Sequence, residues 1–142
     1  MSVDEHRTVV RRYFSDLINK RDYTAADRLL GADFRFHDPA VSPEPMTREA
    51  FLSFLGAFNA AFPDYQFSVE DQIVCDDKAV ARWRFTGTHL GEFLGIPATG
   101  RAVTATGIDI FEFAGGRIVQ AWAEANLAGL LRQLGVLPGS SD

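Results

Sequence analysis

The stretch that decides the fold is Ala102-Val-Thr-Ala-Thr-Gly-Ile-Asp-Ile-Phe-Glu-Phe-Ala-Gly-Gly-Arg-Ile-Val-Gln-Ala-Trp-Ala-Glu-Ala-Asn126. Apolar and polar side chains alternate on both sides of Ala114-Gly-Gly116, and a period of two residues is typical of strands. Glycines between two such segments favour a tight hairpin turn, because they adopt positive φ angles at little cost. The stretch therefore predicts two antiparallel strands, over residues 102–113 and 117–126.

The same period extends toward the N-terminus of this hairpin. It predicts strands over 65–74 and 78–88, joined by a turn at Asp76-Asp77, and a long loop over 89–101 that holds three glycines and a proline. A further short strand over 34–38 alternates in the same way and ends at Pro39, which cannot donate a ladder hydrogen bond.

Helical spacing dominates the first part of the chain. Ser2 and Glu5 form a capping-box pattern ahead of a helix expected to run to Lys20, and a short helix is expected over 24–30. A third helix begins after Thr47 and ends before Pro63, and a last one spans 127–134. Helices, a short strand, four long antiparallel strands and a terminal helix together predict an α+β fold.

Composition narrows the function. The chain has 142 residues with a net charge of -5 and no basic run, so it lacks the electrostatic footprint of a nucleic-acid-binding protein. No apolar stretch approaches the length of a membrane span, and the N-terminus lacks the features of a signal peptide. The single cysteine permits no internal disulfide, and we expect a cytoplasmic protein. Aromatic residues make up 12% of the chain, enough to build a core and line a cavity.

One loop carries a family resemblance. The stretch Gly87-Thr-His-Leu-Gly-Glu-Phe-Leu-Gly-Ile-Pro-Ala-Thr-Gly-Arg101 closely resembles the central signature of the SnoaL-like polyketide cyclases, which belong to the NTF2-like superfamily. The similarity covers roughly residues 5–135, and we take residues 1–142 as a single domain with a polar tail over 136–142. Other segments agree in their order along the chain: Phe62-Pro-Asp64, Gly107 to Phe113, Gly116-Arg-Ile118, Trp122, and Leu130 to Gly135.

The resemblance implies a cone-shaped barrel, in which a curved antiparallel sheet wraps around the N-terminal helices and encloses an apolar pocket. It also implies a homodimer through the outer face of the sheet, and the bulky residues on both faces of the strand over 79–85 fit such a partner. The cyclases of this family close a ring by intramolecular aldol condensation without a metal or cofactor. They usually carry an aspartate acid/base four residues beyond the tryptophan of the last strand, where this chain has Asn126.

Strand alternation selects candidate site residues. Ile118, next to the hairpin, is expected in the core, so Trp122, Glu124 and Asn126 on the same face are expected to point inward. Phe113 is likewise expected in the core, so Asp109 on the same face of its strand is expected to point inward. An apolar wall there would raise the pKa of its carboxyl toward that of a general base. The alternative for Asp109 is a carboxylate paired with the backbone or with Arg82.

The remaining candidates lie on other segments. Because strand neighbours point in opposite directions, one of His37 and Asp38 must face the cavity, and Asp38 can instead cap the turn that follows it. Arg82 on the middle strand either polarises a substrate carbonyl or faces solvent or a dimer partner. His89 either donates a proton or fixes its loop, and Phe58 both packs in the core and lines the pocket. The three histidines, at 6, 37 and 89, match no metal-ligand spacing, so no metal site is expected.

These residues leave several functions open. The leading hypothesis is a cyclase of natural-product biosynthesis, acting on a small apolar substrate that bears a carbonyl or a polyene. Asp109 or Asp38 would remove a proton while Arg82, Asn126 and His89 hold the oxyanion. Alternatively, the pocket folds its substrate into a reactive conformer, or Asp38 and Asp109 activate water against an epoxide. A further alternative is an isomerase, or a dimeric ligand-binding protein without catalysis.

Overall fold

The computed structural model describes residues 2–137, so residues 138–142 of the expected polar tail lie outside the described part of the chain. Six strands form one mixed sheet in the order β2-β1-β6-β5-β4-β3. The strands are β1 (Leu30–His37), β2 (Met46–Thr47), β3 (Gln66–Val74), β4 (Lys78–Thr88), β5 (Ala102–Ala114) and β6 (Arg117–Ala125). The curved sheet does not close, because the order begins at β2 and ends at β3. The structure confirms the α+β class.

The N-terminal helices differ in part from the expected ones. The capping box of Ser2 and Glu5 begins α1 (Val3–Arg12), but the expected single helix continues as a π-helix, η1 (Tyr13–Asn19). The helix expected over 24–30 is shorter: a 3-10 turn, η2 (Tyr23–Ala25), leads into α2 (Ala26–Leu29). The chain becomes extended already at Leu30, the first residue of β1.

The other two helices match their predictions closely. Thr47 caps α3 (Arg48–Ala61) by accepting a hydrogen bond from the backbone N–H of Ala50, and α4 (Leu127–Gln133) follows β6 directly. The sheet is not wholly antiparallel, because β1 pairs in parallel with β6. It also contains β2, a two-residue strand at the end of the loop between β1 and α3.

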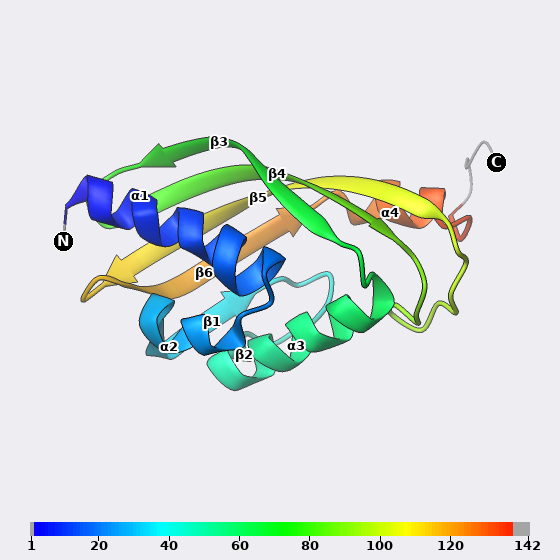
Figure 1. Ribbon diagram of the computed structural model, residues 1–142, viewed down its shortest axis with the longest axis horizontal. Helices are drawn as coiled ribbons and strands as arrows, with labels where there is room; N and C mark the ends of the chain where they lie inside the picture. The colour runs from blue at the N-terminus through cyan, green and yellow to red at the C-terminus, as the bar shows by residue number, and fades with distance from the viewer. Residues whose placement is uncertain (1, 138–142) are drawn as a thin grey trace.

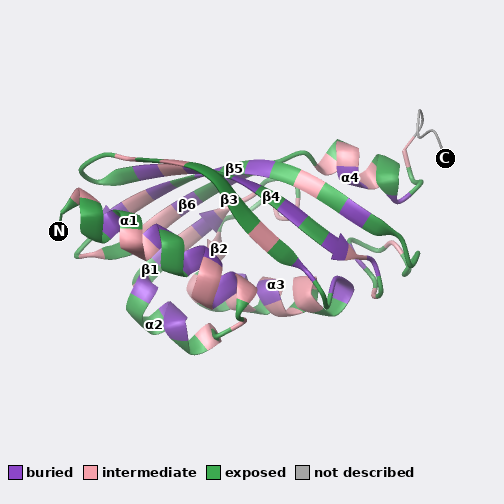
Figure 2. Ribbon diagram, turned by 45° about the horizontal axis from the view of Figure 1, so that its top comes forward, coloured by how far each residue is buried: buried purple, intermediate pink, exposed green. Residues whose placement is uncertain are grey.

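The two longest strands, β4 and β5, alternate in burial. Along β4, Ala79, Ala81, Trp83 and Phe85 are buried, while Arg82 and Arg84 between them are exposed. Figure 2 shows this alternation as bands along β4 and β5. The helices α1, α2 and α3 lie across one face of the sheet, and α4 lies near the far end of β5 and β6 (Figure 1). The core and the pocket therefore lie between this inner face and the helices, and no element within residues 2–137 covers the outer face.

No helix among residues 2–137 is long and apolar enough to span a membrane.

Candidate functional site

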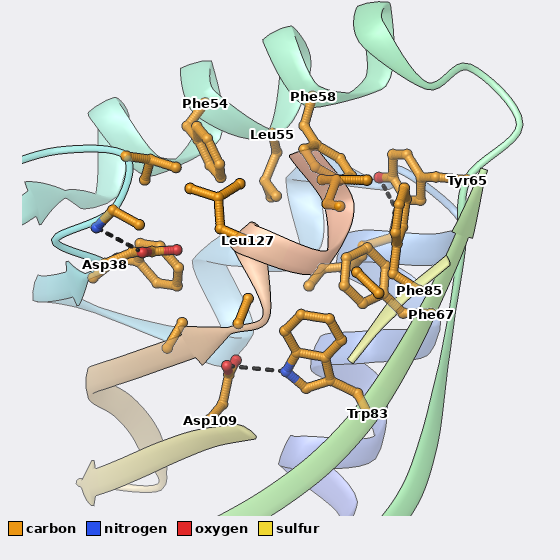
Figure 3. Close-up of a pocket in the computed structure, with 18 of the residues that line it drawn as sticks. Asp38, Phe54, Leu55, Phe58, Tyr65, Phe67, Trp83, Phe85, Asp109 and Leu127 are labelled. Carbon is orange, nitrogen blue, oxygen red and sulfur yellow. Dashed lines mark hydrogen bonds between the residues drawn. The ribbon is translucent and has the colours of Figure 1, made fainter. Parts of the chain in front are cut away.

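A cavity of about 110 Å³ lies between α3, α4, the turn after β1 and the inner face of the sheet (Figure 3). Aromatic rings from several elements dominate its wall, and Phe58 of α3 packs within 5.2 Å of the Phe85 ring and 6.0 Å of the Phe67 ring, between centroids. The prediction that Phe58 lines the pocket is confirmed. Its polar lining is small: Asp38, Asp109, Asn126, Trp83 and the two tyrosines Tyr13 and Tyr65.

Asp109 is the most deeply buried acid of the cavity, with 4% of its surface exposed. It lies on β5 between the outward-facing Ile108 and Ile110, so alternation sends its carboxylate inward, as predicted. Its Oδ1 accepts a hydrogen bond of 3.1 Å from the indole Nε1 of Trp83, which Figure 3 shows as a dashed line. Burial raises the pKa of the Asp109 carboxyl to about 7; the Trp83 bond opposes this shift, and the charge of Asp38 adds to it.

Gly107 makes room for Trp83. The two residues face each other across the β4–β5 pair, and a Cβ atom on Gly107 would lie 2.2 Å from Cζ2 of the indole ring. Only glycine therefore lets the indole lie against β5 and reach Asp109, two residues along the strand. Trp83 was not among the residues predicted for the site. Its inward parity, shared with Ala81 and Phe85, was the signal that could have found it.

Asp38 lines the same cavity from the turn that follows β1, and its carboxylate is half-buried. Its Oδ1 accepts a hydrogen bond of 3.2 Å from the backbone N–H of Ala40. Burial raises the pKa of Asp38; the Ala40 bond lowers it in part, and the charge of Glu124 raises it further. Of the pair His37 and Asp38, the structure therefore selects Asp38 for the cavity. Asp38 also accepts the capping bond of the turn, so both interpretations of this residue hold.

Two other polar side chains complete the site. Tyr13 of η1 is buried, and burial raises the pKa of its hydroxyl well above the ordinary value, with a smaller contribution from the Asp109 charge. Its hydroxyl therefore stays protonated at neutral pH. Asn126 lines the cavity as predicted, and its Oδ1 accepts a hydrogen bond of 3.0 Å from the backbone N–H of Gly129. Asn126 is thus the N-cap of α4, with its amide N–H₂ still able to donate.

The inward placement of Trp122 and Glu124 is wrong, because β6 contains a bulge. Phe113 faces Ile118, whereas its neighbour Glu112 faces Gln120, so Val119 is an extra residue in β6. A bulge shifts the alternation by one residue. Beyond it, Ala121 and Ala123 are buried, while Trp122 is 36% exposed and Glu124 is also exposed.

His37 and Arg82 also lie outside the cavity, on the outer face of the sheet. His37 is the register partner of Trp122 and stacks on its ring at 5.1 Å, and its Nε2 lies 2.6 Å from Oε1 of Gln120. Arg82 is exposed, because its neighbours Ala81 and Trp83 take the inward positions of β4. Its exposure contradicts the alternatives in which Arg82 points inward, to pair with Asp109 or to polarise a substrate carbonyl, and agrees with the one in which it faces solvent or a partner.

His89 is fully buried but does not line the cavity. Its Nδ1 accepts a hydrogen bond of 3.2 Å from the backbone N–H of Thr99, and its ring packs 5.4 Å from that of Phe62. The backbone of His89 also bonds Gly100 and Arg101, which closes the loop. Of the two interpretations of His89, the structure supports the one in which this residue fixes its loop.

No group of three His, Cys, Asp or Glu side chains within residues 2–137 is arranged to hold a metal ion. The polar groups of the cavity can instead accept protons, donate hydrogen bonds and exchange protons near neutral pH.

The sequence profile of the SnoaL-like polyketide cyclases matches residues 8–134. The chain belongs to this family. Three solved structures share the fold of this chain. TsrD from Streptomyces laurentii is 33% identical with a TM-score of 0.85, and the match covers 96% of this chain and 99% of TsrD. AclR from Streptomyces galilaeus, a proposed hydroxylase, is 25% identical with a TM-score of 0.84, over 96% of this chain and 100% of AclR.

The third structure is IdmH from Streptomyces antibioticus, a proposed polyketide cyclase. It is 28% identical with a TM-score of 0.82, over 92% of this chain and 99% of IdmH. No curated protein sequence matches the chain. Membership of the SnoaL-like family and these neighbours support a cyclase-type role for the protein.

Proposed function

We propose that the protein closes a ring in a small polyketide-like, carbonyl-bearing substrate by proton transfer, with Asp109 as the general base. The observation that carries this proposal is the carboxylate of Asp109, which is buried in an aromatic cavity with a pKa of about 7. A base with a pKa near the working pH combines a large ionised fraction with a strong driving force for proton transfer.

The proposed reaction is intramolecular, and the proton that Asp109 removes returns to the product. The Asp109 carboxylate takes a proton from the carbon next to one carbonyl, and the resulting enolate attacks a second carbonyl to form a carbon–carbon bond. The protonated Asp109 then returns its proton to the new alkoxide. The Tyr13 hydroxyl and the Asn126 amide are the available hydrogen-bond donors for the developing oxyanion, in place of Arg82 and His89, which lie elsewhere.

The aromatic walls contribute by shape. Phe54, Phe58 and Leu55 of α3 face the sheet across the cavity, so a flexible chain bound there is confined between two walls (Figure 3). Bringing two reacting carbons into contact in this way lowers the entropic part of the barrier.

Water addition is a second candidate function, and the pair of carboxylates in one cavity favours it. Asp38 and Asp109 differ in burial, so one can hold a proton while the other activates water or a hydroxyl against an epoxide. The relative AclR, a proposed hydroxylase, fits this alternative as well.

Deuterium exchange tests the base directly. We expect the protein to accelerate exchange of the benzylic protons of phenylacetone in D₂O, followed by ¹H NMR, and Asp109→Asn to lose about 10²–10⁴-fold of this rate. Asp38→Asn should lose less, and Glu112→Gln, an outward acid on the same strand, should lose none. Near-wild-type exchange in both Asp variants would rule out acid/base chemistry and leave conformational templating or ligand binding.

We also propose that the protein is a homodimer through the outer face of the sheet. Four apolar residues form one row across this face in register: Ile73, Val80, Ile110 and Trp122. Ile73 is 59% exposed and Ile110 41%, and a row of this kind on a soluble chain is typical of an interface. The reducing cytoplasm is the compartment that suits its exposed free thiol, Cys75.

The next row of the outer face supports a two-fold arrangement. Arg82 and Glu124 flank Ile108 on either side, and no ion pair within residues 2–137 involves either of them. A two-fold axis along β5 would place Arg82 of one copy opposite Glu124 of the other, so that both charges gain a partner.

A further inference from the structure

The cavity has an unusual balance of charge. It is lined by two carboxylates, Asp38 and Asp109, and none of its lining residues is Lys, Arg or His. The titratable groups beside the pair add no positive charge, since Tyr13 faces Asp109, and Glu124 acts on Asp38. The field inside the cavity is therefore negative whenever either carboxyl ionises.

The two carboxylates have unused capacity to accept hydrogen bonds. The Asp109 carboxylate accepts a hydrogen bond from Trp83, and that of Asp38 accepts one from the backbone of Ala40. An ionised carboxylate offers about four acceptor positions. Because both residues line the cavity, water or a ligand bound there can supply donors to the remaining positions.

The aromatic walls suit the same kind of ligand. In Figure 3 the carboxylates of Asp38 and Asp109 lie on one side of the cavity, and the rings of Phe58, Phe67 and Phe85 gather on the other. The indole of Trp83 lies between these two sides. The face of an aromatic ring attracts a cation, most strongly in tryptophan. An anion placed here would meet two carboxylates and the negative faces of the rings.

We infer that the cavity binds an aromatic or polyene molecule that carries a protonated amine, and that it rejects molecules that carry a carboxylate. The amine donates to Asp38, and its charge favours the ionised form of Asp109, whose carboxylate stays free to act as the base. The apolar part packs against the rings of α3 and β4. At about 110 Å³ the cavity is somewhat smaller than the roughly 150 Å³ that takes benzene, so one small ring fills it. The inference rests on the proposed function, because it takes the same cavity as the substrate site.

Three probes of nearly equal shape test the charge preference: benzylamine, benzyl alcohol and benzoate, titrated into the full chain at pH 7 by isothermal calorimetry. We expect benzylamine to bind about 10–100-fold more tightly than benzyl alcohol, the range of a charge-assisted hydrogen bond, and benzoate to bind least. Benzyl alcohol binding as tightly as benzylamine would overturn the inference. So would benzoate binding as tightly as the alcohol, or benzylamine failing to bind at millimolar concentration.

Proton release gives a second measurement that needs no variant. A bound ammonium group stabilises the ionised form of Asp109, so benzylamine should release protons near pH 7 and benzyl alcohol should not. Titrations in buffers of different ionisation enthalpy measure this release. Equal release by the two probes contradicts the inference.

Variants then place the effect on the two acids. The double variant Asp38→Asn/Asp109→Asn should bring benzylamine to the affinity of benzyl alcohol, whereas Glu112→Gln should keep the wild-type difference. A full amine preference in the double variant would contradict the inference. Binding without turnover separates this test from the proposed reaction. If the wild type binds the three probes without preference while Asp109→Asn still slows exchange, only the ligand class is contradicted. The assignment of Asp109 as the base is unaffected by that result.

Discussion

The two faces of one sheet place the same chemical groups in opposite environments. On β5, Asp109 points inward, is 4% exposed and has a pKa of about 7. Three residues further along, Glu112 points outward and forms an ion pair of 3.0 Å with Lys78. The backbone that carries the two acids is the same, so the face decides whether a carboxylate forms a surface ion pair or is buried with a raised pKa.

The same comparison applies to the two tryptophans. Trp83 on the inner face donates to Asp109, while Trp122 on the outer face stacks on His37 and lies 5.8 Å from the Lys78 ammonium. Their strands both alternate, and only the bulge at Val119 gives Trp122 the outward position. Matched substitutions on the inner and the outer face of the sheet therefore test this difference most directly.

The largest effect is expected for Asp109→Asn on stability. The folded pKa of about 7 lies above the ordinary value of 3.8, so between these pH values the folded state binds a proton that the unfolded state has lost. The stability of the wild type should then fall as pH rises from about 4 to 7, by up to about 4 kcal/mol in total. Asp109→Asn should remove this loss, so that the variant is more stable than the wild type at pH 8 and similar at pH 4. Urea unfolding at the two pH values measures the difference, and an equal effect at both would contradict the buried carboxylate.

Charge reversal on the outer face comes next. In the proposed dimer Arg82→Glu places like charges opposite each other, and its dimer dissociation constant should rise at least about tenfold, or 1.4 kcal/mol. The double exchange Arg82→Glu/Glu124→Arg should restore most of the wild-type affinity. Analytical ultracentrifugation checks both variants. A wild type with the mass of one subunit, 15.7 kDa, at micromolar concentration would refute the dimer itself.

A smaller effect is expected for the Trp83 hydrogen bond. Because the indole N–H lowers the pKa of Asp109, Trp83→Phe should raise that pKa by up to about one unit, which corresponds to about 1.4 kcal/mol. A carboxyl ¹³C NMR titration measures the shift. The pH at which phenylacetone exchange levels off should rise together with this pKa in Trp83→Phe. Trp122→Phe is the matched control and should leave the titration unchanged. An unshifted Asp109 in Trp83→Phe would show that the indole only fills space.

The smallest effect is expected for the outer-face residues on catalysis. Trp122→Ala and Arg82→Ala should keep phenylacetone exchange within about twofold of the wild type, whereas Phe58→Ala, in the cavity wall, should weaken substrate binding more strongly. Initial rates over a range of substrate concentrations separate the two effects. A tenfold loss in Trp122→Ala would mean that the outer face reaches the site.

The sequence predicted most of the sheet, because alternation is a local property of each strand. The bounds of β4, β5 and β6 came within about one residue of the expected ones, and the inward position of Asp109 followed from Phe113 beside the turn. The loop over 89–101 revealed the family through a contiguous motif. The π-helix and the parallel pairing of β1 with β6 were missed, since both depend on packing between distant segments.

The site was predicted less completely, for a physical reason that one residue illustrates. The bulge at Val119 leaves no mark in the local pattern, yet it reverses the facing of every residue after it in β6. Trp122 and Glu124 were therefore placed on the wrong face. Asn126 still reached the cavity because it lies past the strand end, at the cap of α4. Trp83 was missed because its role depends on the space that Gly107 leaves on the neighbouring strand.

The most direct test of the central claim is the pH dependence of phenylacetone exchange in the wild type and in Asp109→Asn. If the inner face makes Asp109 the base, the wild-type rate rises with pH as the carboxyl ionises, levels off above a pKa of about 7, and loses this rise in the variant. A profile that is the same in both proteins, or a wild-type rate that levels off already near pH 4, would contradict the claim.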